Sequence, residues 1–430
     1  MNMRKYILLS LSLAALVSCT REKVLTADFN LSAADQSLFQ ITSIGDTDLS
    51  KGLPDDCYIP TEEGVTKATS VTANVLLADL LEYGNQSKVL EIAGVYSSFD
   101  SSDGYEEIKL SGKVLLPKNR KPKRYIVSCH WTIGSNAEAP SNCFPLEGVL
   151  CNLGYALICP DYCGYGVTAD RIHPYLMLEQ TAFDVWMMYL AVRKMLANTE
   201  YAPEFDDIYI MGYSQGGATA MGFDWFLETN GFDQSDMIPE FKTTVRCVFA
   251  GGGPYDVRET YNNFITTNHA SICCAVPMVI QGMIKGNNLD IDPREILEPW
   301  LYEKMDEWIN SKKYSTAQMN SLIGTTTTSD LLTDMGMDPT SEPVARLYQA
   351  MSENSLLSYN WTPKAPVYMI HSIDDDTVPF INAAKARSKW ENGNITYNFG
   401  HYGTHIATAL RFVSSVKSYL ENAQKENSDN

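Results

Sequence analysis

The stretch Asp207-Ile208-Tyr209-Ile210-Met211-Gly212-Tyr213-Ser214-Gln215-Gly216-Gly217 decides the fold of this chain. Its first part, up to Met211, is short, apolar and rich in isoleucine, which predicts a buried strand. Small residues follow Gly216 and predict a tightly packed helix. Ser214 therefore lies at a sharp turn from strand to helix, where a G-x-S-x-G motif predicts a projecting nucleophilic hydroxyl with helix N–H groups behind it. A glycine-rich turn without chemistry is the alternative.

Short apolar runs alternate with helical patterns on both sides of this turn. The alternation predicts an α/β fold, with a mostly parallel sheet and helices on both of its faces. The predicted strands are 89–96, 107–116, 125–129, 155–159, 207–211, 245–250, 366–370 and 395–399. One long helix is predicted over 176–196. The last helix carries Ile406, Leu410, Val413, Val416 and Leu420 on one face.

The block 257–363 lies between two strands of the predicted sheet and carries helical patterns instead of strand patterns. We therefore predict that it is an inserted helical cap, which divides the core into a first part at 88–256 and a second part at 364–421. Helical patterns in the cap occur at 276–284, 299–309 and 345–351. The apolar run 275–280 suits either the acyl group of a substrate or the cap's own core.

A serine hydroxyl needs a base that removes its proton, and the base needs a carboxylate that orients it. In a fold of this kind the order along the chain is serine, acid, histidine. The acid is expected after the strand at 366–370, where Asp374, Asp375 and Asp376 are adjacent. Successive side chains of an extended segment point in alternating directions, so the middle carboxylate points away from its two neighbours. One of the three is therefore expected to be the acid.

Two histidines follow the last predicted strand, at positions from which the base can come. His405 lies at the N-terminus of the last helix and is favoured, while His401, directly after the strand, is the alternative. The remaining histidines are less suited: His130 fits a turn, His173 precedes the nucleophile, His269 lies in the cap and His371 belongs to the acid segment.

An oxyanion hole requires two backbone N–H donors near the nucleophile. Gln215 directly follows Ser214 and is expected to supply one of them. The second donor is expected in the loop after the strand at 125–129, from Thr132 or Trp131.

Together these residues resemble the α/β-hydrolase fold over about residues 88–421, and more narrowly its secreted lipases and esterases. The matching stretches are Gly154-Tyr155-Ala156, Pro160-Asp161-Tyr162-Cys163-Gly164-Tyr165-Gly166, His173-Pro174-Tyr175-Leu176, Gly212-Tyr213-Ser214-Gln215-Gly216-Gly217, Asn354-Ser355-Leu356 and Trp361-Thr362-Pro363. The acid motif of these families reads H-G-x-x-D-x-x-V-P, which implies Asp375 as the catalytic acid and leaves Ser372 where glycine is usual. The resemblance also implies a helical cap over the acyl site and a structural role for His173.

The function implied is that of a serine carboxylic-ester hydrolase, which cleaves a small-molecule or lipid ester through Ser214, Asp375 and His405 by way of an acyl-enzyme. A serine peptidase of the same fold is one alternative, and a non-catalytic surface lipoprotein that binds lipid or glycan is another. No metal ion or organic cofactor is implied. The net charge of −19 argues against a nucleic-acid partner.

Residues 1–18 look like a targeting segment, with Arg4 and Lys5 before an apolar run that is too short for an ordinary membrane-spanning helix. The following stretch Leu16-Val17-Ser18-Cys19 resembles the lipobox of bacterial lipoproteins. That resemblance implies that Cys19 becomes the lipidated N-terminus and anchors the protein to a membrane of the bacterial cell envelope. An ordinary signal peptide is the alternative.

The segment 19–87 is predicted to be a tether and an N-terminal extension, with one amphipathic helix possible at 71–81, and 422–430 is predicted to be a polar tail. Of the 10 cysteines, nine remain once Cys19 is lipidated, so at least one is free or paired between molecules. They show no zinc-binding spacing and are expected to be small core residues.

Overall fold

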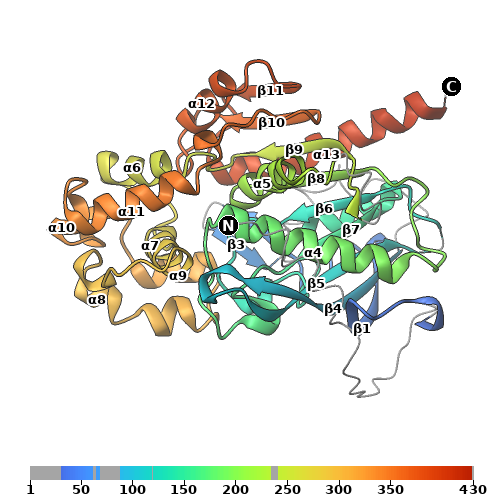
Figure 1. Ribbon diagram of the computed structural model, residues 1–430, viewed down its shortest axis with the longest axis horizontal. Coiled ribbons are helices and arrows are strands. Elements are labelled where there is room, and N and C mark those ends of the chain that lie inside the picture. The colour runs from blue at the N-terminus through green and yellow to red at the C-terminus, as the bar shows by residue number, and fades with distance from the viewer. Residues whose placement is uncertain (1–30, 62–63, 68–87, 119, 234–240, 429–430) are drawn as a thin grey trace.

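The computed structural model describes residues 31–61, 64–67, 88–118, 120–233 and 241–428. Within them the main feature is a nine-stranded sheet of order β1-β4-β5-β7-β6-β8-β9-β10-β11 (Figure 1). Its strands are β1 (Phe39–Asp48), β4 (Lys88–Asp100), β5 (Glu106–Pro117), β6 (Tyr125–Cys129), β7 (Ala156–Pro160), β8 (Ile208–Tyr213), β9 (Val245–Gly251), β10 (Val367–Ser372) and β11 (Ile395–Gly400). A separate hairpin consists of β2 (Tyr58–Thr61) and β3 (Gly64–Lys67).

The sheet has an antiparallel part and a larger parallel part. β1, β4, β5 and β7 pair antiparallel, whereas every pair from β7 to β11 is parallel. The residues of β6, β7 and β8 are buried on both faces, as parallel strands between two helical layers require. This confirms the mostly parallel α/β-hydrolase sheet that the sequence predicts, and it places the carboxyl ends of these strands along one edge.

The first strand of the sheet lies in the segment that the sequence analysis treats as an N-terminal extension. Phe39–Asp48 pairs with β4 along its length, so the predicted start of the core at residue 88 is wrong for the sheet. A register shift between Ile41 and Ser43 interrupts the pairing, and it moves the next inward side chain to Ile44. The bulge therefore breaks the period-two pattern of apolar residues by which strands are predicted.

Helices cover both faces of the sheet. α4 (Leu178–Leu196) and α5 (Gln215–Asn230) pack together on one face, around the fully buried Trp186. α13 (His405–Ser428) covers the opposite face, where Phe412 and Val416 contribute to the core. α12 (Ile381–Lys389) connects β10 to β11. Helix α13 continues to Ser428, so the tail predicted from residue 422 is part of this helix up to that point.

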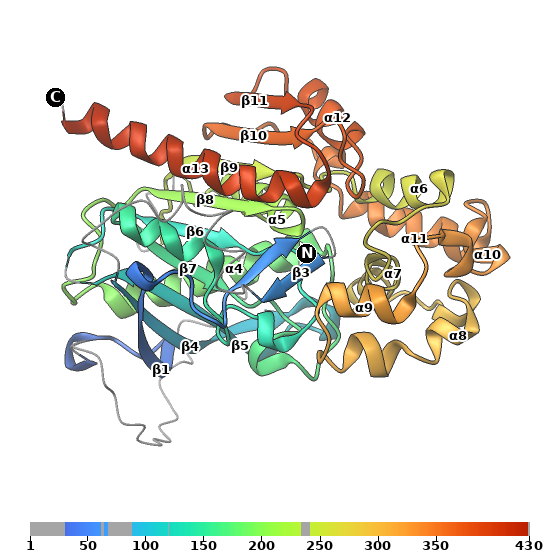
Figure 2. The same ribbon diagram turned by 180° about the vertical axis from the view of Figure 1, so that it is seen from behind.

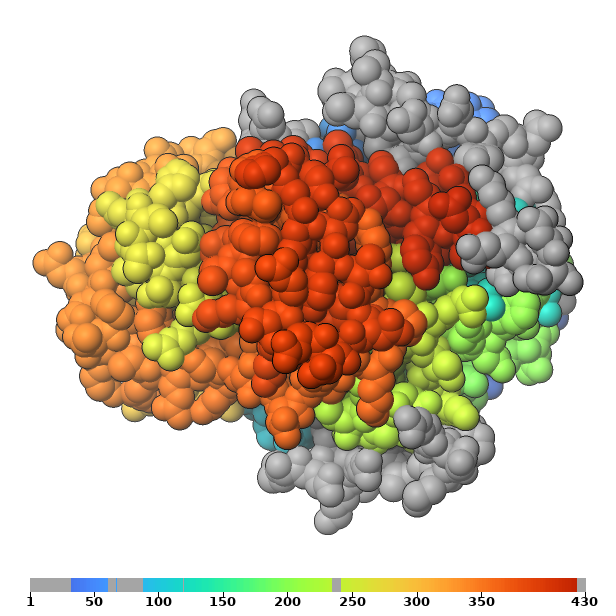
Figure 3. All heavy atoms as spheres, turned by 90° about the horizontal axis from the view of Figure 1, so that it is seen from above, coloured from blue at the N-terminus to red at the C-terminus, as the bar shows by residue number. Residues whose placement is uncertain are grey.

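The block between β9 and β10 is helical, and its apolar core also includes Tyr175, Leu176 and Met177 from the segment before α4. Its helices are α6 (Val257–Thr267), α7 (Ala275–Gly286), α8 (Pro299–Tyr302), α9 (Thr316–Ile323), α10 (Asp334–Met337) and α11 (Glu342–Glu353). Figure 3 shows their yellow and orange atoms as a lobe beside the red C-terminal segments. The helix predicted over 299–309 is divided into α8 and a π-helical turn at Met305–Asn310. The run 275–280 is buried in the core of this lobe.

The β2–β3 hairpin joins the lobe to the rest of the molecule. β2 packs on α13, and β3 packs on α9 (Figure 2). Cys57 and Ile59 are buried in the core layer under α13. A part of the chain without a recognisable motif is therefore placed between the sheet layer and the helical lobe.

All nine cysteines of the described residues are buried free thiols, whereas the sequence count requires only one to be unpaired. Among these residues no helix is both long enough and apolar enough to cross a membrane. The targeting segment, the lipobox and the helix predicted at 71–81 lie outside the described residues. Short helical turns occur at Leu31–Ala33, Leu49–Lys51, Ser101–Asp103, Asn136–Glu138, Leu146–Leu153, Gly166–Thr168, Pro293–Glu295, Thr328–Asp330 and Leu356–Ser358.

Candidate active site

Ser214 lies between β8 and α5 in a backbone conformation that side chains seldom adopt, with φ 58° and ψ −125°. Two close backbone contacts create this turn. A Cβ at Gly212 would lie 2.1 Å from the carbonyl oxygen of Gly216, and one at Gly216 would lie 2.0 Å from that of Cys129. Both positions therefore require glycine, and the turn presents the Ser214 side chain at the edge of the sheet.

The structure brings Ser214, His405 and Asp375 together from three distant parts of the chain. The Nε2 atom of His405 lies 2.8 Å from the Ser214 Oγ, and its Nδ1 lies 2.7 Å from the Asp375 Oδ2. A proton on Nδ1, donated to the carboxylate, leaves Nε2 as the acceptor for the serine proton. This geometry allows general-base activation of Ser214.

The Asp375 side chain is fully buried and held by several donors. Its Oδ1 accepts backbone hydrogen bonds from Thr377 at 3.0 Å and Val378 at 2.7 Å. Burial by itself would raise the pKa of Asp375. The opposing effects are larger and come from the charge and hydrogen bond of His405, the charge of His371 and the Thr377 N–H. The pKa of Asp375 therefore lies below its usual value. The acid is therefore ionised opposite the imidazole.

The backbone of His405 is fixed as firmly as its ring. Its N–H donates to the Asp376 Oδ1 at 3.0 Å, and its carbonyl oxygen accepts from the Tyr213 hydroxyl at 2.6 Å. By contrast, the side chain of His401 is 73% exposed and pairs with Asp374 at 2.8 Å. The alternative base thus lies on the surface, paired with an aspartate that is not the one facing His405.

Ser372 replaces the usual glycine of the acid motif and connects two loops of the site. Its hydroxyl donates to the Gly403 carbonyl at 2.7 Å and accepts from the backbone N–H groups of Asp374 and Tyr402, both at 3.2 Å. The departure from the family pattern therefore adds a link between the loop of the acid and the loop of the base.

Gln215, expected to supply one oxyanion-hole donor, and Thr132, one of the two candidates for the other, are buried beside Ser214, and the alternative Trp131 lines the same space. Gln215 is 2% exposed and Thr132 is 8% exposed. Their side chains are held by one segment: the Nε2 of Gln215 lies 2.8 Å from the Nε2 of His173, and the Oγ1 of Thr132 lies 2.6 Å from the Tyr175 hydroxyl. The segment His173–Tyr175 therefore fixes the side chains of Gln215 and Thr132.

The tautomer of His173 follows from its neighbours. Its Nδ1 lies 2.6 Å from the Cys163 carbonyl oxygen and must donate, so its Nε2 accepts the hydrogen bond from Gln215. Burial, with the charge of Lys312 from the helical lobe, lowers the pKa of His173 to about 3. The histidine stays neutral at ordinary pH and keeps this acceptor. The position of His173 before Ser214 in the sequence argued against it as the base. That position does not indicate its contact with Gln215.

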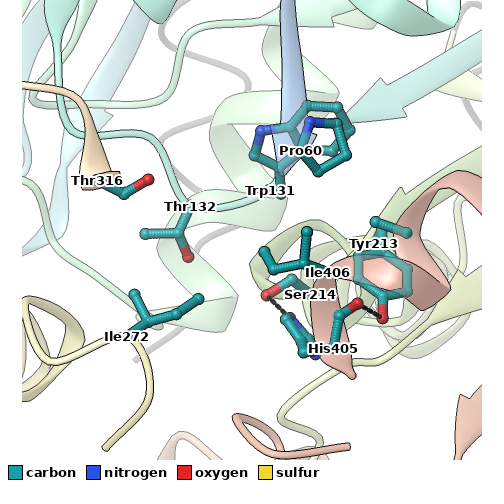
Figure 4. A pocket seen from close by; sticks show the side chains of 10 residues that line it. Pro60, Trp131, Thr132, Tyr213, Ser214, Ile272, Thr316, His405 and Ile406 are labelled. Carbon is teal, nitrogen blue, oxygen red and sulfur yellow. Dashed lines mark hydrogen bonds between the residues drawn. The ribbon is translucent and has the colours of Figure 1, made fainter. Parts of the chain in front are cut away.

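A small apolar pocket of about 30 Å³ lies beside Ser214 (Figure 4). Its lining residues are Pro60, Trp131, Thr132, Tyr213, Ser214, Ile272, Thr316, His405, Ile406 and Ala409. Of these, Ile272 and Thr316 come from the helical lobe and Pro60 from the β2–β3 hairpin. These three residues were not predicted as site residues, because they meet only when three separate segments pack together. We refer to this space as the nucleophile pocket.

The other histidines have structural surroundings. His130 is buried and stacked on Tyr162, with ring centroids 3.9 Å apart, and burial lowers its pKa to about 4. His269 is exposed on the helical lobe. His371 lies behind the acid, with its Nε2 3.6 Å from the Asp375 Oδ2, and burial lowers its pKa as well.

Comparisons with known proteins show similarity to lipases and esterases. A family model described as secretory lipase matches residues 146–415. The cell wall degrading esterase LipA from Xanthomonas oryzae has a similar structure, with a TM-score of 0.66 and 20% identity over 81% of this chain and 92% of LipA. A putative hydrolase from Legionella pneumophila has a TM-score of 0.69 and 17% identity, over 89% of this chain and 97% of that hydrolase. Lipase A from Candida antarctica has a TM-score of 0.54 and 15% identity, over 81% of this chain and 76% of the lipase. The comparison with curated proteins gives no match. At these identities, the three structures show a shared fold.

Proposed function

This chain belongs to the secretory lipase family and is a carboxylic-ester hydrolase, and we propose that it cleaves its ester through Ser214, His405 and Asp375 by way of an acyl-enzyme. The observation that carries this proposal is the His405 imidazole, which lies within 2.8 Å of the serine hydroxyl and 2.7 Å of a buried carboxylate. Family membership also argues against the non-catalytic binding protein that the sequence analysis left open.

In the first half-reaction the Ser214 Oγ attacks the acyl carbon of the ester while His405 takes the serine proton. The negative charge that develops on the carbonyl oxygen is stabilised by the backbone N–H groups of Gln215 and Thr132. The bond to the alcohol oxygen then breaks, and that oxygen takes the proton from His405. In the second half-reaction His405 activates water, which releases the acid and restores Ser214.

The nucleophile pocket supports a short acyl group. A water molecule needs about 10–15 Å³ of such space, and the pocket offers about 30 Å³, so it suits a small acyl group. Ile272, Ile406 and Ala409 contribute apolar side chains to its wall. Acetate and propionate esters are therefore the preferred substrates in this proposal, and long-chain esters are poor ones.

The test is a comparison of wild-type protein and Ser214→Ala on p-nitrophenyl esters of increasing chain length and on an aminoacyl p-nitroanilide. Wild type is expected to favour acetate over octanoate and esters over the anilide. A fluorophosphonate probe is expected to label wild type and not Ser214→Ala. Substantial ester hydrolysis by purified Ser214→Ala would show that the nucleophile is another residue, and a preference for the anilide would support the peptidase alternative.

For its location, the proposal includes a lipid anchor at Cys19, on the basis of the lipobox-like stretch Leu16-Val17-Ser18-Cys19. A secretory family suits a protein of the cell envelope or the extracellular space. Replacing Cys19 with serine is expected to move the protein from the membrane fraction to the soluble fraction with its esterase activity retained. A variant that stays with the membranes would contradict the anchor.

A further inference from the structure

A second and larger hollow has a volume of about 800 Å³. The same three segments line both spaces. Strand β2 contributes Tyr58 to the hollow and Pro60 to the pocket, and the start of α9 contributes Ser315 to the hollow and Thr316 to the pocket. The loop after β6 likewise supplies residues to both. Because neighbouring residues of the same segments line both spaces, we place the hollow next to the pocket.

The charged groups of this hollow are two lysines. Lys67 from β3 and Lys313 from the loop before α9 line it, and no Asp or Glu does so among the described residues. Within the described part of the chain, neither ammonium group has a carboxylate at ion-pair distance. The charge of Lys67 also acts on Asp56, where it partly opposes the rise in the pKa of that carboxyl caused by burial. In a chain whose net charge is −19, two lysines that face one space give it a local preference for an anion. We refer to this space as the basic hollow.

The remaining lining is suited to a hydroxylated group rather than to a hydrocarbon chain. Tyr58 and Tyr314 contribute amphipathic rings, and the Lys67 Nζ lies over the Tyr58 ring at 5.8 Å from its centroid. Gln318 adds an exposed amide. Rings that offer an apolar face beside hydroxyl, amide and ammonium donors match the alternating C–H and O–H surfaces of a sugar.

We propose that the basic hollow binds the alcohol part of the ester, and that this part is a large, hydroxylated, negatively charged group of the acidic-sugar class. The inference rests on the proposed function, because the acyl group must occupy the nucleophile pocket for the alcohol part to lie in the hollow. When the bond between the acyl carbon and the alcohol oxygen breaks, the protonated alcohol remains in the hollow and leaves from it. The substrate class is therefore a short-chain ester of an acidic carbohydrate.

The test uses an O-acetylated galacturonic acid oligosaccharide and the same oligosaccharide with its carboxylates converted to amides. Acetate release by the wild-type protein is expected to have a kcat/KM roughly tenfold higher for the acidic form, which corresponds to two exposed ion pairs. In Lys67→Gln/Lys313→Gln this ratio is expected to fall close to one. Salt at about 1 M shortens the Debye length to about 3 Å and is expected to reduce the wild-type ratio in the same way.

Lys304→Gln is the matched control, because Lys304 is an exposed lysine of the same lobe that pairs with Glu307 and does not line the hollow. It is expected to keep the wild-type ratio. Equal rates on the acidic and amidated substrates, or no acetate release from either by a protein that cleaves p-nitrophenyl acetate, would overturn the proposal and leave the proposed function intact.

A binding measurement tests the basic hollow independently of ester hydrolysis. Calorimetry with Ser214→Ala is expected to detect the acidic oligosaccharide and a Kd roughly tenfold weaker for the amidated one. If wild type hydrolyses no ester while Ser214→Ala still shows this difference, the proposed function fails and the hollow remains an anion site. If the two oligosaccharides bind equally to Ser214→Ala, the charge assignment of the basic hollow is wrong.

Discussion

At the scale of single residues, His405 is held by two of the three adjacent aspartates. Asp375 orients the ring through Nδ1, and Asp376 accepts from the backbone N–H at the start of α13. The alternation of side chains along the acid segment separates these two carboxylates, as the sequence predicts, but both still reach the same histidine. Asp375 faces the side chain of His405, and Asp376 faces its main chain.

His405→Ala and Asp375→Ala are each expected to lower kcat by about 10⁴- to 10⁶-fold, because base and acid act as one unit with the nucleophile. The double variant is expected to be little worse than either single variant. Steady-state kinetics on p-nitrophenyl acetate provide the measurement. His401→Ala serves as the control and is expected to retain nearly full activity, since its ring is exposed and pairs with Asp374. An inactive His401→Ala with an active His405→Ala would identify His401 as the base.

Asp376→Ala is expected to lower kcat by roughly ten- to a hundredfold, because the backbone of His405 loses an acceptor and a small displacement of the imidazole is costly. KM is expected to change little. Asp374→Ala is the matched neighbour. Its carboxylate pairs with the exposed His401 and has no contact with His405 among the described residues, so kcat is expected to change by no more than about twofold. Equal effects of the two substitutions would mean that the contact between Asp376 and His405 does not position the base.

His173→Ala is expected to lower kcat about tenfold with a nearly unchanged KM, since Gln215 loses the acceptor that holds it beside Ser214. The loss should stay below the roughly 10²- to 10³-fold cost of removing an oxyanion donor itself. His173→Gln offers an amide oxygen as an acceptor and is expected to restore part of kcat. A loss of thermal stability without any kcat effect in the folded enzyme would indicate a purely structural histidine.

At the scale of secondary-structure elements, the site depends on how closely α5 approaches β6. The carbonyl oxygen of Cys129 at the end of β6 occupies the space where a side chain at position 216 would begin. The strand-to-helix turn therefore depends on glycine for a tertiary reason as well as a local one. The motif in the sequence marks the turn but does not show which strand end lies against it.

Gly216→Ala is expected to destabilise the protein by roughly 1–3 kcal/mol or more, because its Cβ would lie 2.0 Å from the Cys129 carbonyl oxygen. Activity is expected to fall with it, as the displaced helix start carries Gln215. Gly45→Ala in strand β1 is the control, because nothing lies within 4 Å of its added Cβ. Denaturant unfolding measures both variants. Similar free energies of unfolding for the two would show that the contact with Cys129 can relax.

At the scale of the whole molecule, several buried carboxyl groups couple stability to pH. Burial raises the pKa of Glu138 and Glu147 to about 7 and that of Asp184 to about 8. In the unfolded chain these groups lose their protons near their usual pKa values, about 4. The folded protein therefore binds more protons than the unfolded chain between these limits, and its stability falls as the pH rises through the native pKa values.

The free energy of unfolding is expected to decrease by roughly 1–3 kcal/mol between about pH 6.5 and 8. This window lies above the usual pKa of histidine, about 6.5, so His130 and His173, whose pKa values are lowered by burial, contribute little there. Asp184→Asn is expected to reduce the pH dependence without abolishing it, because an amide does not titrate while Glu138 and Glu147 still do. Denaturant titrations at several pH values measure it, and a stability that rises over this window would contradict the assigned shifts.

The sequence alone determined the alternation of strands and helices, the glycine-flanked turn at Ser214, and the order of Ser214, Asp375 and His405 along the chain. These features are local: a buried strand needs apolar residues, and a strained turn needs glycine on both sides of Ser214. The proposed roles of Ser214, Asp375 and His405 therefore came from motif and order, and the structure places these side chains within hydrogen-bonding distance.

Only the tertiary structure decided which segments meet at the site. The β2–β3 hairpin carries no motif, yet it brings Pro60 to the nucleophile pocket and Lys67 to the basic hollow. His173 contacts Gln215 although 42 positions separate them. Contacts of this kind depend on how whole layers pack, because the partners lie far apart in the chain and neither local propensity nor spacing encodes their distance. The bulge likewise prevented the prediction of β1 from the sequence. A period-two pattern that one extra residue interrupts is recognisable only beside the paired strand.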